Sequence, residues 1–385
     1  MKILVTGAKG FIGKNLVEAL KHTEDIDILP YDIDSEQELL YKYAAECDFA
    51  VHLAGINRPL DKSEFMTGNF RFTEELLNSL KIAGNKAPVL ITSSIQAELD
   101  NPYGKSKLAA ERLMLEYGSE TGAPVLIYRL PNVFGKWCRP NYNSAVATFC
   151  YNIARDMPIT VTDPEICLTL AYIDDVVNEI LDEINKFSYG TLNIKNELRY
   201  IPVCYRATLG QITELLMSFK ESRRTLNVPD VSDEFEKKLY STYLSYLPED
   251  RLAYDLTMHS DYRGSFTEII RTPDRGQFSV NISKPGIVKG EHWHHTKNEK
   301  FLVVSGRGVI RLRSIQGGGI SEYFVSGDKL RIIDIPPGFT HNIENLGETD
   351  MVTFMWANET FNPDIPDTFP ENVLPTAEAA GEKRK

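Results

Sequence analysis

Residues 2–13 read KILVTGAKGFIG, in which a short apolar run leads directly into closely spaced glycines. The run has the length of a buried strand, and the glycines allow a tight turn into a helix. Such a turn brings backbone N–H groups against a pyrophosphate at the positive end of the helix. A bare strand-to-helix turn is the alternative, but a second apolar run ends at Asp32, about 20 positions further on, where a carboxylate holds ribose hydroxyls. The stretch therefore predicts a dinucleotide-binding βαβ unit.

Up to about residue 200, short apolar runs alternate with longer segments whose apolar residues recur at helical spacing. This alternation is typical of a parallel sheet covered by helices, so we expect an α/β Rossmann domain over residues 1–245. The expected strands are 2–6, 27–31, 49–53, 88–92 and 125–129, and the expected helices include 14–22 and 108–117.

From about residue 250 the composition of the sequence changes: Gly and Pro become frequent, and short runs rich in β-branched and aromatic residues recur. Such runs at regular spacing predict an all-β sandwich or barrel, which we place at residues 246–372. Residues 373–385 are expected to be a disordered tail. The expected strands of this second domain are 277–282, 301–304, 308–312, 321–325, 330–335 and 351–356.

The composition excludes several partner classes. A net charge of −12 gives no electrostatic reason to expect nucleic acid or an anionic membrane. The five cysteines form no C-x-x-C pair, which favours reduced thiols in the cytoplasm. We find neither a signal peptide nor an apolar window of roughly 18 residues, so a membrane location is not expected.

A tyrosine and a lysine stand four positions apart in the stretch YGKSK, residues 103–107. At the start of a helix, Tyr103 and Lys107 would share one face, and the ammonium would lower the pKa of the phenol. A tyrosine tuned in this way can protonate a carbonyl oxygen while hydride arrives at carbon. The pair alone is a weak signal, but Ser94 follows an expected strand and offers a hydroxyl for the same oxygen.

With these residues and four further segments, the first ~240 residues resemble an extended short-chain dehydrogenase/reductase acting on nucleotide sugars. The segments are HLAG at 52–55, Asn69, RLPNVFG at 129–135 and YIDDV at 172–176. The resemblance implies Ser94, Tyr103 and Lys107 as catalytic residues. It implies a cofactor site formed by Gly7, Gly10, Phe11, Ile12, Gly13, Asp32, Leu53, Ala54, Tyr103 and Lys107. It also implies a sugar-nucleotide site at Asn132, Lys136, Asn141 and Asn143, for which an ordinary surface loop is the alternative.

One departure from that family restricts the reaction. Sugar-nucleotide dehydratases carry an Asp-Glu pair directly after the catalytic hydroxyl residue, whereas this chain has Ile95 and Gln96. Neither residue exchanges protons, so we expect a simple ketone reduction. The interval from Ser94 to Tyr103 is short for the family, which makes Ser94 the less secure of the three assignments.

The second domain carries a histidine pattern with metal-ligand spacing. The string Gly286-x5-His292-x-His294-x4-Glu299-x6-Gly306 matches the first cupin motif, and a second motif supplies His341. Histidines at i and i+2 on a strand face the same side, and a carboxylate on the next strand can join them. The set His292, His294, Glu299 and His341 suits Zn²⁺, Mn²⁺, Fe²⁺ or Ni²⁺, of which we expect Zn²⁺.

A different resemblance leaves the role of His292 open. The segments DYRGSFTE at 261–268 and KGEH at 289–292 are similar to deoxysugar-4-ketone epimerases. Those enzymes use the histidine at the His292 position as a base and need no metal. His292 is therefore either a metal ligand or a general base, and the full motif favours the ligand.

The whole chain, residues 135–144 and 290–300 included, resembles bifunctional capsular polysaccharide biosynthesis enzymes of the UDP-N-acetyl-L-fucosamine pathway, in which such a reductase is fused to a cupin. The resemblance implies a UDP-2-acetamido-2,6-dideoxy-β-L-arabino-4-hexulose substrate, epimerised at carbon 3 by the cupin. The reductase would then reduce the 4-ketone to the L-talose configuration. Epimerisation must come first, because reduction removes the acidity of the C–H next to the ketone.

The cofactor and the assembly are less fixed by this resemblance. The family is associated with NADPH, but Asp32 would repel a 2′-phosphate and favours NADH. A homodimer is expected. Two alternatives remain: a 4-keto-sugar reductase with a non-catalytic, sugar-binding cupin, and a redox-responsive binding protein.

Overall fold

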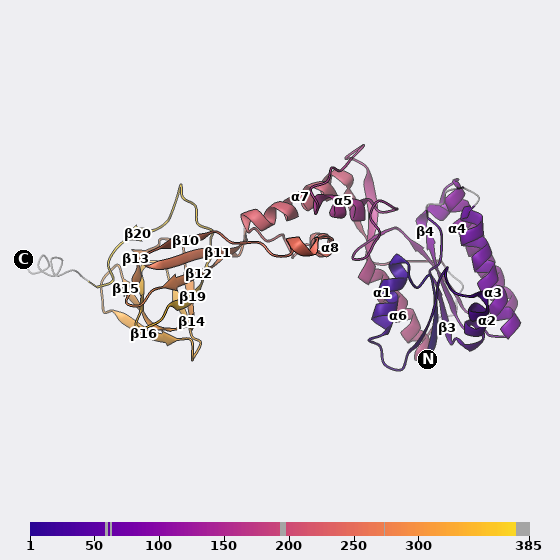
Figure 1. Ribbon diagram of the computed structural model, residues 1–385, viewed down its shortest axis with the longest axis horizontal. Coiled ribbons are helices and arrows are strands. Elements are labelled where there is room, and N and C mark those ends of the chain that lie inside the picture. The colour runs from indigo at the N-terminus through magenta and orange to yellow at the C-terminus, as the bar shows by residue number, and fades with distance from the viewer. Residues whose placement is uncertain (58–60, 62–63, 193–197, 273, 375–385) are drawn as a thin grey trace, which may run out of the picture. The chain divides into compact units, whose positions relative to one another are not determined.

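The computed structural model describes residues 1–57, 61, 64–192, 198–272 and 274–374 (Figure 1). These form two compact units, one of Met1–Met217 with Ser232–Glu249 and one of Ser218–Val231 with the described residues from Asp250 onward. The domain limits expected from the sequence, 1–245 and 246–372, remain a proposal. Of the expected disordered tail 373–385, residues 375–385 lie outside the described residues. The expectation is wrong for Val373, which is fully buried and hydrogen-bonded to Glu291 and Arg313.

The N-terminal unit contains a six-stranded parallel sheet in the order β2-β1-β3-β4-β5-β8. Its central strands are apolar on both faces, because helices cover both sides of a parallel sheet. Ile3, Leu4 and Val5 are accordingly fully buried. The six strands are β1 (Lys2–Thr6), β2 (Asp27–Tyr31), β3 (Phe49–His52), β4 (Val89–Ser94), β5 (Val125–Leu130) and β8 (Leu198–Tyr200).

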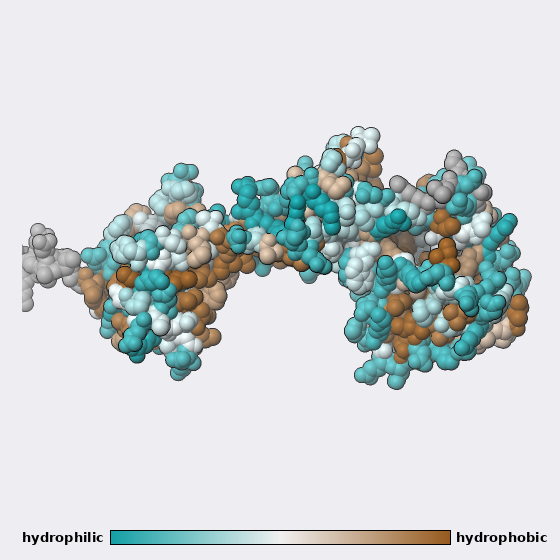
Figure 2. Space-filling model, viewed as in Figure 1, coloured by the Kyte–Doolittle hydropathy of each residue, from teal (hydrophilic) through white to brown (hydrophobic). Residues whose placement is uncertain are grey.

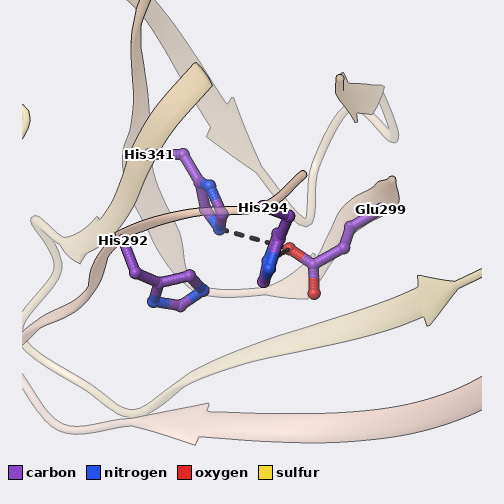
Figure 3. Close-up of side chains that lie close together, drawn as sticks. All are labelled: His292, His294, Glu299 and His341. Atoms are coloured by element: carbon purple, nitrogen blue, oxygen red, sulfur yellow. Dashed lines mark ion pairs between the residues drawn. The ribbon is translucent and has the colours of Figure 1, made fainter. Parts of the chain in front are cut away.

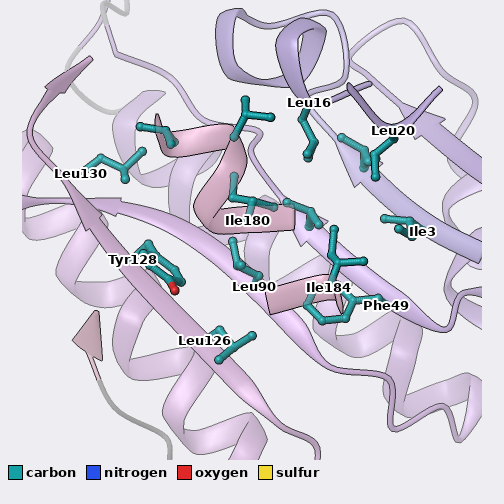
Figure 4. Close-up of a cluster of buried hydrophobic side chains, with 14 of the residues drawn as sticks. Ile3, Leu16, Leu20, Phe49, Leu90, Leu126, Tyr128, Leu130, Ile180 and Ile184 are labelled. Atoms are coloured by element: carbon teal, nitrogen blue, oxygen red, sulfur yellow. The ribbon is translucent and has the colours of Figure 1, made fainter. Parts of the chain in front are cut away.

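Two hydrophobic clusters fix the helices of this unit against the sheet. On one face, Leu16 and Leu20 of α1 and Ile180 and Ile184 of α6 pack on the strands (Figure 4). The other face is covered by α2, α3 and α4. The elements so far unnamed are α1 (Phe11–Leu20), α2 (Gln37–Glu46), η1 (Met66–Arg71), α3 (Phe72–Ala83), η2 (Ile95–Glu98), α4 (Pro102–Thr121), α5 (Ala145–Ile153), α6 (Ile173–Ser188), α7 (Leu209–Thr225), α8 (Glu234–Ser245) and η3 (Glu249–Arg251).

A second, three-stranded sheet of the same unit runs β6-β7-β9. These strands are β6 (Asn132–Phe134), β7 (Cys167–Tyr172) and β9 (Tyr205–Thr208). None of the helices in the described part of the chain combines the length and the apolar character that crossing a bilayer would require.

The C-terminal unit is built from two sheets whose named strands pair antiparallel, in the orders β10-β11-β12-β19-β14-β17 and β16-β15-β18-β13-β20. Part of the space between them is filled by an apolar core that includes Phe301, Val303, Ile310 and Ile343. The strands are β10 (Met258–Asp261), β11 (Gly264–Thr272), β12 (Gly276–Ser283), β13 (Val288–Trp293), β14 (Glu299–Ser305), β15 (Arg307–Ser314), β16 (Ser321–Ser326), β17 (Ile332–Ile335), β18 (Phe339–Asn345), β19 (Met351–Ala357) and β20 (Phe369–Pro370). The expected α/β-plus-all-β architecture is confirmed.

Strand β12 reverses the usual polarity of a sheet strand. Gln277, Ser279 and Asn281 are buried and point between the sheets, while Phe278 is half exposed on the outer face. Buried polar side chains are tolerated where hydrogen bonds or a wet cavity satisfy them. The polar inner face of β12 therefore marks the part of the unit that is hollow rather than packed.

Candidate functional sites

In the glycine turn after β1, the backbone lies close to the backbone of residues 53–54 and to the start of α1. Gly7 has a φ of +68°, and a Cβ there would lie 2.7 Å from the backbone nitrogen of Ala54. A Cβ on Gly13 would lie 2.1 Å from the carbonyl oxygen of Gly7, so a side chain is excluded at both positions. Helix α1 begins at Phe11 without a side-chain cap, which leaves its first N–H groups for a ligand.

Residues around this turn occupy the places expected of a cofactor site. The backbone N–H of Leu53 donates to the carbonyl of Thr6 over 3.1 Å, which holds the end of β3 beside the turn. The carboxylate of Asp32 accepts hydrogen bonds from the backbone N–H groups of Lys9 (2.6 Å) and Ile33 (2.8 Å). A carboxylate has about four acceptor sites, so Asp32 retains capacity for ribose hydroxyls.

The tyrosine–lysine motif lies at the N-terminus of α4, as predicted. Asn101 caps the helix by accepting a hydrogen bond from Gly104 N–H over 2.8 Å. A Cβ on Gly104 would lie 2.2 Å from the carbonyl oxygen of Gln96, so the helix start packs directly on η2. This contact brings Tyr103 within hydrogen-bonding reach of the Ser94 hydroxyl.

Lys107, one helical turn after Tyr103 in α4, is buried. Its ammonium donates to the carbonyl oxygen of Thr92 over 3.2 Å and lies 6.0 Å from the centre of the Tyr103 ring. Burial lowers the pKa of Lys107 to about 8, although Glu111 acts in the opposite direction. The structure therefore brings Ser94, Tyr103 and Lys107 into one site.

The expected lowering of the tyrosine pKa is wrong for the protein alone. Burial raises the pKa of Tyr103, and the hydrogen bond with Ser94 opposes that rise only in part. Desolvation disfavours the charged phenolate, and this effect outweighs the hydrogen bond with Ser94. In this environment Tyr103 is a neutral phenol, the form that donates a proton.

A buried ion pair beneath the site was not predicted. Both carboxylate oxygens of Glu111 accept hydrogen bonds from the Arg129 guanidinium, at 2.9 and 2.7 Å, and Ser93 donates to the same carboxylate at 2.5 Å. This network joins β4, α4 and β5 under Ser94 and Lys107. The sequence analysis singled out Arg129 only as the first residue of RLPNVFG. That motif does not indicate Glu111 as the partner of the arginine.

The predicted sugar-nucleotide residues are spread over β6 and the loop after it. Asn132, Asn141 and Asn143 are exposed, and Lys136 forms an ion pair with Asp174. These positions are accessible to a ligand, and their role stays a prediction.

In the C-terminal unit, His292, His294, Glu299 and His341 point toward one another (Figure 3). One ligand atom from each of the four lies within 4.8 Å of the others. The Oε2 atom of Glu299 is 3.3 Å from Nε2 of His294 and 3.2 Å from Nε2 of His341. Strand β13 supplies His292, the residue directly after β13 is His294, and β14 and β18 supply Glu299 and His341.

A bulge in β13 sets which side chains enter this cluster. The pairing of β13 with β18 shifts between Gly290 and His292, and the extra residue Glu291 has a φ of +61°. A bulge re-aims the side chains that follow it. As a result Lys289 and His292 both line the cavity, while the Glu291 carboxylate bonds the Asn342 amide and the Val373 N–H, both at 2.6 Å.

The four residues fit a divalent metal ion. Nε2 of His294, Nε2 of His341 and Oε2 of Glu299 are buried, and apart from their contacts with one another they have no hydrogen-bond partner in the described part of the chain. Burial lowers the pKa of His292 to about 4, which keeps that imidazole neutral as a ligand must be. Burial acts to raise the pKa of Glu299, but the two histidines beside it outweigh burial and hold that pKa well below its usual range. Orphaned donor atoms of this kind are the signature of a ligand set.

The cluster opens into a cavity of about 920 Å³ between the two sheets. Its walls are polar, and the ammonium of Lys289 lies in them, donating to Asn281 Oδ1 and the Ile282 carbonyl, both at 2.8 Å. Cavities of a few hundred Å³ and more accommodate small-molecule ligands. Besides the four cluster residues, lining residues include Ser265, Glu268, Gln277, Ser279, Asn281, Lys289, Lys297 and Glu359.

Two stretches of the chain match known family models. Residues 3–194 match the NAD dependent epimerase/dehydratase family, and residues 259–369 match the polysaccharide biosynthesis C-terminal domain. The chain is 46% identical, over 96% of its length and 98% of the relative's, to a UDP-2-acetamido-2,6-beta-L-arabino-hexul-4-ose reductase of Pseudomonas aeruginosa. The spore coat polysaccharide biosynthesis protein SpsL of Bacillus subtilis is 30% identical over 122 residues, which are 29% of this chain and 81% of SpsL.

The fold agrees with a solved structure over nearly the whole chain. The capsular polysaccharide assembling protein CapF of Staphylococcus aureus is 55% identical, with a TM-score of 0.90 over 97% of this chain and 100% of CapF.

Proposed function

Because this chain belongs to the family of NAD(P)-dependent nucleotide-sugar enzymes that includes the Pseudomonas reductase and CapF, we propose that it acts twice on one UDP-linked 4-keto amino sugar. The cupin unit would epimerise carbon 3 of UDP-2-acetamido-2,6-dideoxy-β-L-arabino-4-hexulose. The reductase unit would then reduce the 4-ketone to UDP-2-acetamido-2,6-dideoxy-L-talose. The observation that carries the proposal is the convergence of His292, His294, Glu299 and His341 on a polar cavity, in a chain that also carries the Ser94–Tyr103–Lys107 site.

For the reductive step, this chain supplies proton donation and orientation. When bound, the nicotinamide supplies the hydride. Tyr103, whose pKa burial raises above its usual range, donates the phenol proton to the ketone oxygen. Ser94 holds that oxygen beside the phenol, and Lys107 stabilises the tyrosinate left behind.

For the epimerising step, the cupin cavity supplies the ligand set and the polar walls. A metal ion held by the four residues would polarise the ketone and acidify the neighbouring C–H. We propose Zn²⁺, since three imidazoles and one carboxylate are donors that zinc takes. His292 is assigned as a ligand because its ring lies 4.6 Å from that of His341 and 4.9 Å from that of His294, centre to centre. Glu268, Lys289 and Glu359 are titratable lining residues near which the proton transfer takes place.

Deuterium exchange tests the epimerase role. The Zn²⁺-loaded protein would be incubated with the 4-keto substrate in D₂O without nicotinamide, and mass spectrometry would follow deuterium uptake next to the ketone. We expect uptake by the wild type and none by His341→Ala. An absence of uptake by the wild type, with metal present, would leave a reductase whose cupin only binds sugar.

Cofactor preference, assembly and location are further parts of the proposal. We propose NADPH, with NADH as the alternative that Asp32 favours, and kcat/KM for the two cofactors decides between them. The five free cysteines support a reducing, cytoplasmic location. A homodimer is supported by a row of apolar side chains on the outer face of the six-stranded sheet of the C-terminal unit, over β12, β19 and β14 (Figure 2). That row consists of Val280, Phe354, Leu302 and Ile332 in lateral register.

A further inference from the structure

A segment near the C-terminus, residues 367–373, lies across the metal-ligand cluster; we name it the strap. Its strand β20 pairs with β13, so that Pro370 lies opposite His292 and Phe369 opposite Trp293. The Phe369 ring stacks on that of Trp293 at 4.9 Å between centres. The strap therefore adds an edge strand to the sheet that carries the first histidine of the cluster.

The first residue of the strap contacts the remote ring nitrogen of a cluster histidine. The backbone carbonyl of Asp367 is the partner of His294 Nδ1. A carbonyl oxygen can only accept, so Nδ1 must carry the proton. The lone pair of a neutral His294 then lies on Nε2, the atom that points at Glu299. A hydrogen bond to the remote ring nitrogen is the usual means of fixing a ligating histidine.

The side chain of the same residue holds the turn between two cluster members. Oδ1 of Asp367 accepts from the His295 N–H over 2.9 Å. Oδ2 accepts from the N–H groups of Thr296 (2.9 Å) and Lys297 (3.0 Å) and from the Thr296 hydroxyl (3.0 Å). These residues lie between His294 and Glu299. Asp367 itself has a φ of +35°, a left-handed conformation that persists only where its surroundings demand it.

The rest of the strap is tied to neighbours of the other ligands. The N–H of Glu371 donates to the carbonyl of Glu291, next to His292, over 2.9 Å. Its carbonyl accepts from the hydroxyl of Thr340, next to His341. Arg313 donates to the carbonyls of Asn372 and Val373, at 2.7 and 2.9 Å. Each end of the strap is thus fixed to a residue adjacent to a cluster histidine.

We propose that the strap is part of the metal site and that Asp367 is a positioning residue that sets the tautomer and orientation of His294. The proposal rests on the metal-binding role assigned to the cupin. It predicts that metal affinity depends on a residue that offers the ion no ligand atom. Removal of such a supporting partner typically costs about 10- to 100-fold in affinity.

The test compares Asp367→Ala with Asp364→Ala in the full chain. Asp364 is exposed in the segment that leads into the strap and serves as the matched control. Zn²⁺ affinity would be measured by competition with a chromophoric chelator, and Co²⁺ spectra would report the ligand geometry. We expect a loss of about 10-fold or more for Asp367→Ala and none for Asp364→Ala. Asp367→Asn should lose less, since one acceptor oxygen remains.

Two further measurements separate positioning from loss of fold. Circular dichroism and thermal unfolding check that each variant is folded, and Asp367→Asn carries the test if Asp367→Ala does not fold. Both Asp367 variants keep the backbone carbonyl that faces His294 Nδ1 but lose carboxylate bonds to residues 295–297 that hold this carbonyl in place. With ¹⁵N-labelled histidine, NMR of the metal-free protein should therefore show His294 protonated at Nδ1 in the wild type and a tautomer mixture in the variants. Equal Zn²⁺ affinity in the Asp367 variants and the control overturns this proposal but leaves the epimerase intact. A wild type that binds no Zn²⁺ overturns both.

Discussion

Lys107 and Tyr103 show how burial sets protonation in the reductase site. Both groups lose water, and desolvation disfavours whichever form is charged, so the lysine is shifted toward neutrality and the tyrosine held neutral. In the proposed mechanism the tyrosine begins in the form that donates a proton, whereas the lysine must keep its proton to support the tyrosinate. The two requirements are met together only below the pKa of Lys107.

The need for a protonated Lys107 predicts an upper pH limit on the reduction. Since burial lowers the pKa of Lys107 to about 8, kcat/KM of the free enzyme should fall as pH rises through that value, by about tenfold for each further pH unit. Initial rates with the sugar and the nicotinamide both well below their KM values across this pH range provide the measurement. Lys107→Met should be slow throughout and lack the inflection; an inflection that persists in this variant would assign it to another group.

Tyr103→Phe separates chemistry from binding at the same site. The substitution removes the proton donor and leaves the ring, so turnover should fall by roughly 10²- to 10⁴-fold while the nicotinamide still binds. Nicotinamide oxidation and equilibrium cofactor binding are the two readouts. Tyr189→Phe, at an exposed tyrosine, is the control and should keep full activity. Near-full turnover in Tyr103→Phe would exclude it as donor and favour a cofactor-sensing role for the domain.

At the scale of elements, both sites depend on places where one element lies unusually close to another. The start of α4 packs on η2 through Gly104, and β13 is re-aimed by the bulge at Glu291. In each case a short stretch of backbone decides where the functional side chains point. Substitutions at such contacts should act on function through geometry, without touching a reacting atom.

Gly104→Ala tests the α4 contact. A Cβ at 2.2 Å from the Gln96 carbonyl must push the helix start away from η2, at a cost of about 1–3 kcal/mol in the free energy of unfolding. Because Tyr103 precedes this glycine, turnover should fall further than stability alone would explain. Thermal unfolding and nicotinamide oxidation measure the two effects. Lys105→Ala, at an exposed position on the same turn, should change neither by much.

At the scale of the whole molecule, each candidate site is composed of residues from one compact unit with its own core. The order of the two proposed steps is then imposed by the substrate, since the ketone that acidifies the neighbouring C–H is the group that reduction removes. Two sites in one chain need no shared residues to act in sequence.

Metal removal should therefore separate the two activities. Chelation is expected to abolish deuterium exchange next to the ketone, because the orphaned histidine and glutamate atoms lose their ion, while reduction of an already epimerised ketone continues. Mass spectrometry and nicotinamide oxidation on the same sample follow both activities. Adding Zn²⁺ back should restore exchange. Loss of reduction together with exchange would contradict independent sites.

Much of the fold was predictable because local signals agree with the tertiary structure. The strand at 2–6 was predicted to the residue, since buried parallel strands are continuous apolar runs. The edge strand at 27–31 was also predicted to the residue, although only Tyr31 of it is buried. Of the three strands that carry the candidate ligands, β14 overlaps a predicted strand, whereas β13 and β18 were not predicted. Their sequences, VKGEHW and FTHNIEN, mix apolar residues with glycine, histidine, asparagine and glutamate, and His292 and His341 line a cavity instead of a dry core.

The sequence by itself determined the order of the two modules, the glycine turn, the Tyr103–Lys107 spacing and the candidate ligand set, because each depends on residue type and short-range periodicity. Only the tertiary structure decided the protonation of Tyr103, the Glu111–Arg129 pair beneath it and the contact of Asp367 with His294. Those features depend on burial and on residues far apart in the chain, which meet only when the sheets are formed. The physical reason is that desolvation and hydrogen-bond geometry are properties of packed surroundings, which a linear pattern does not contain.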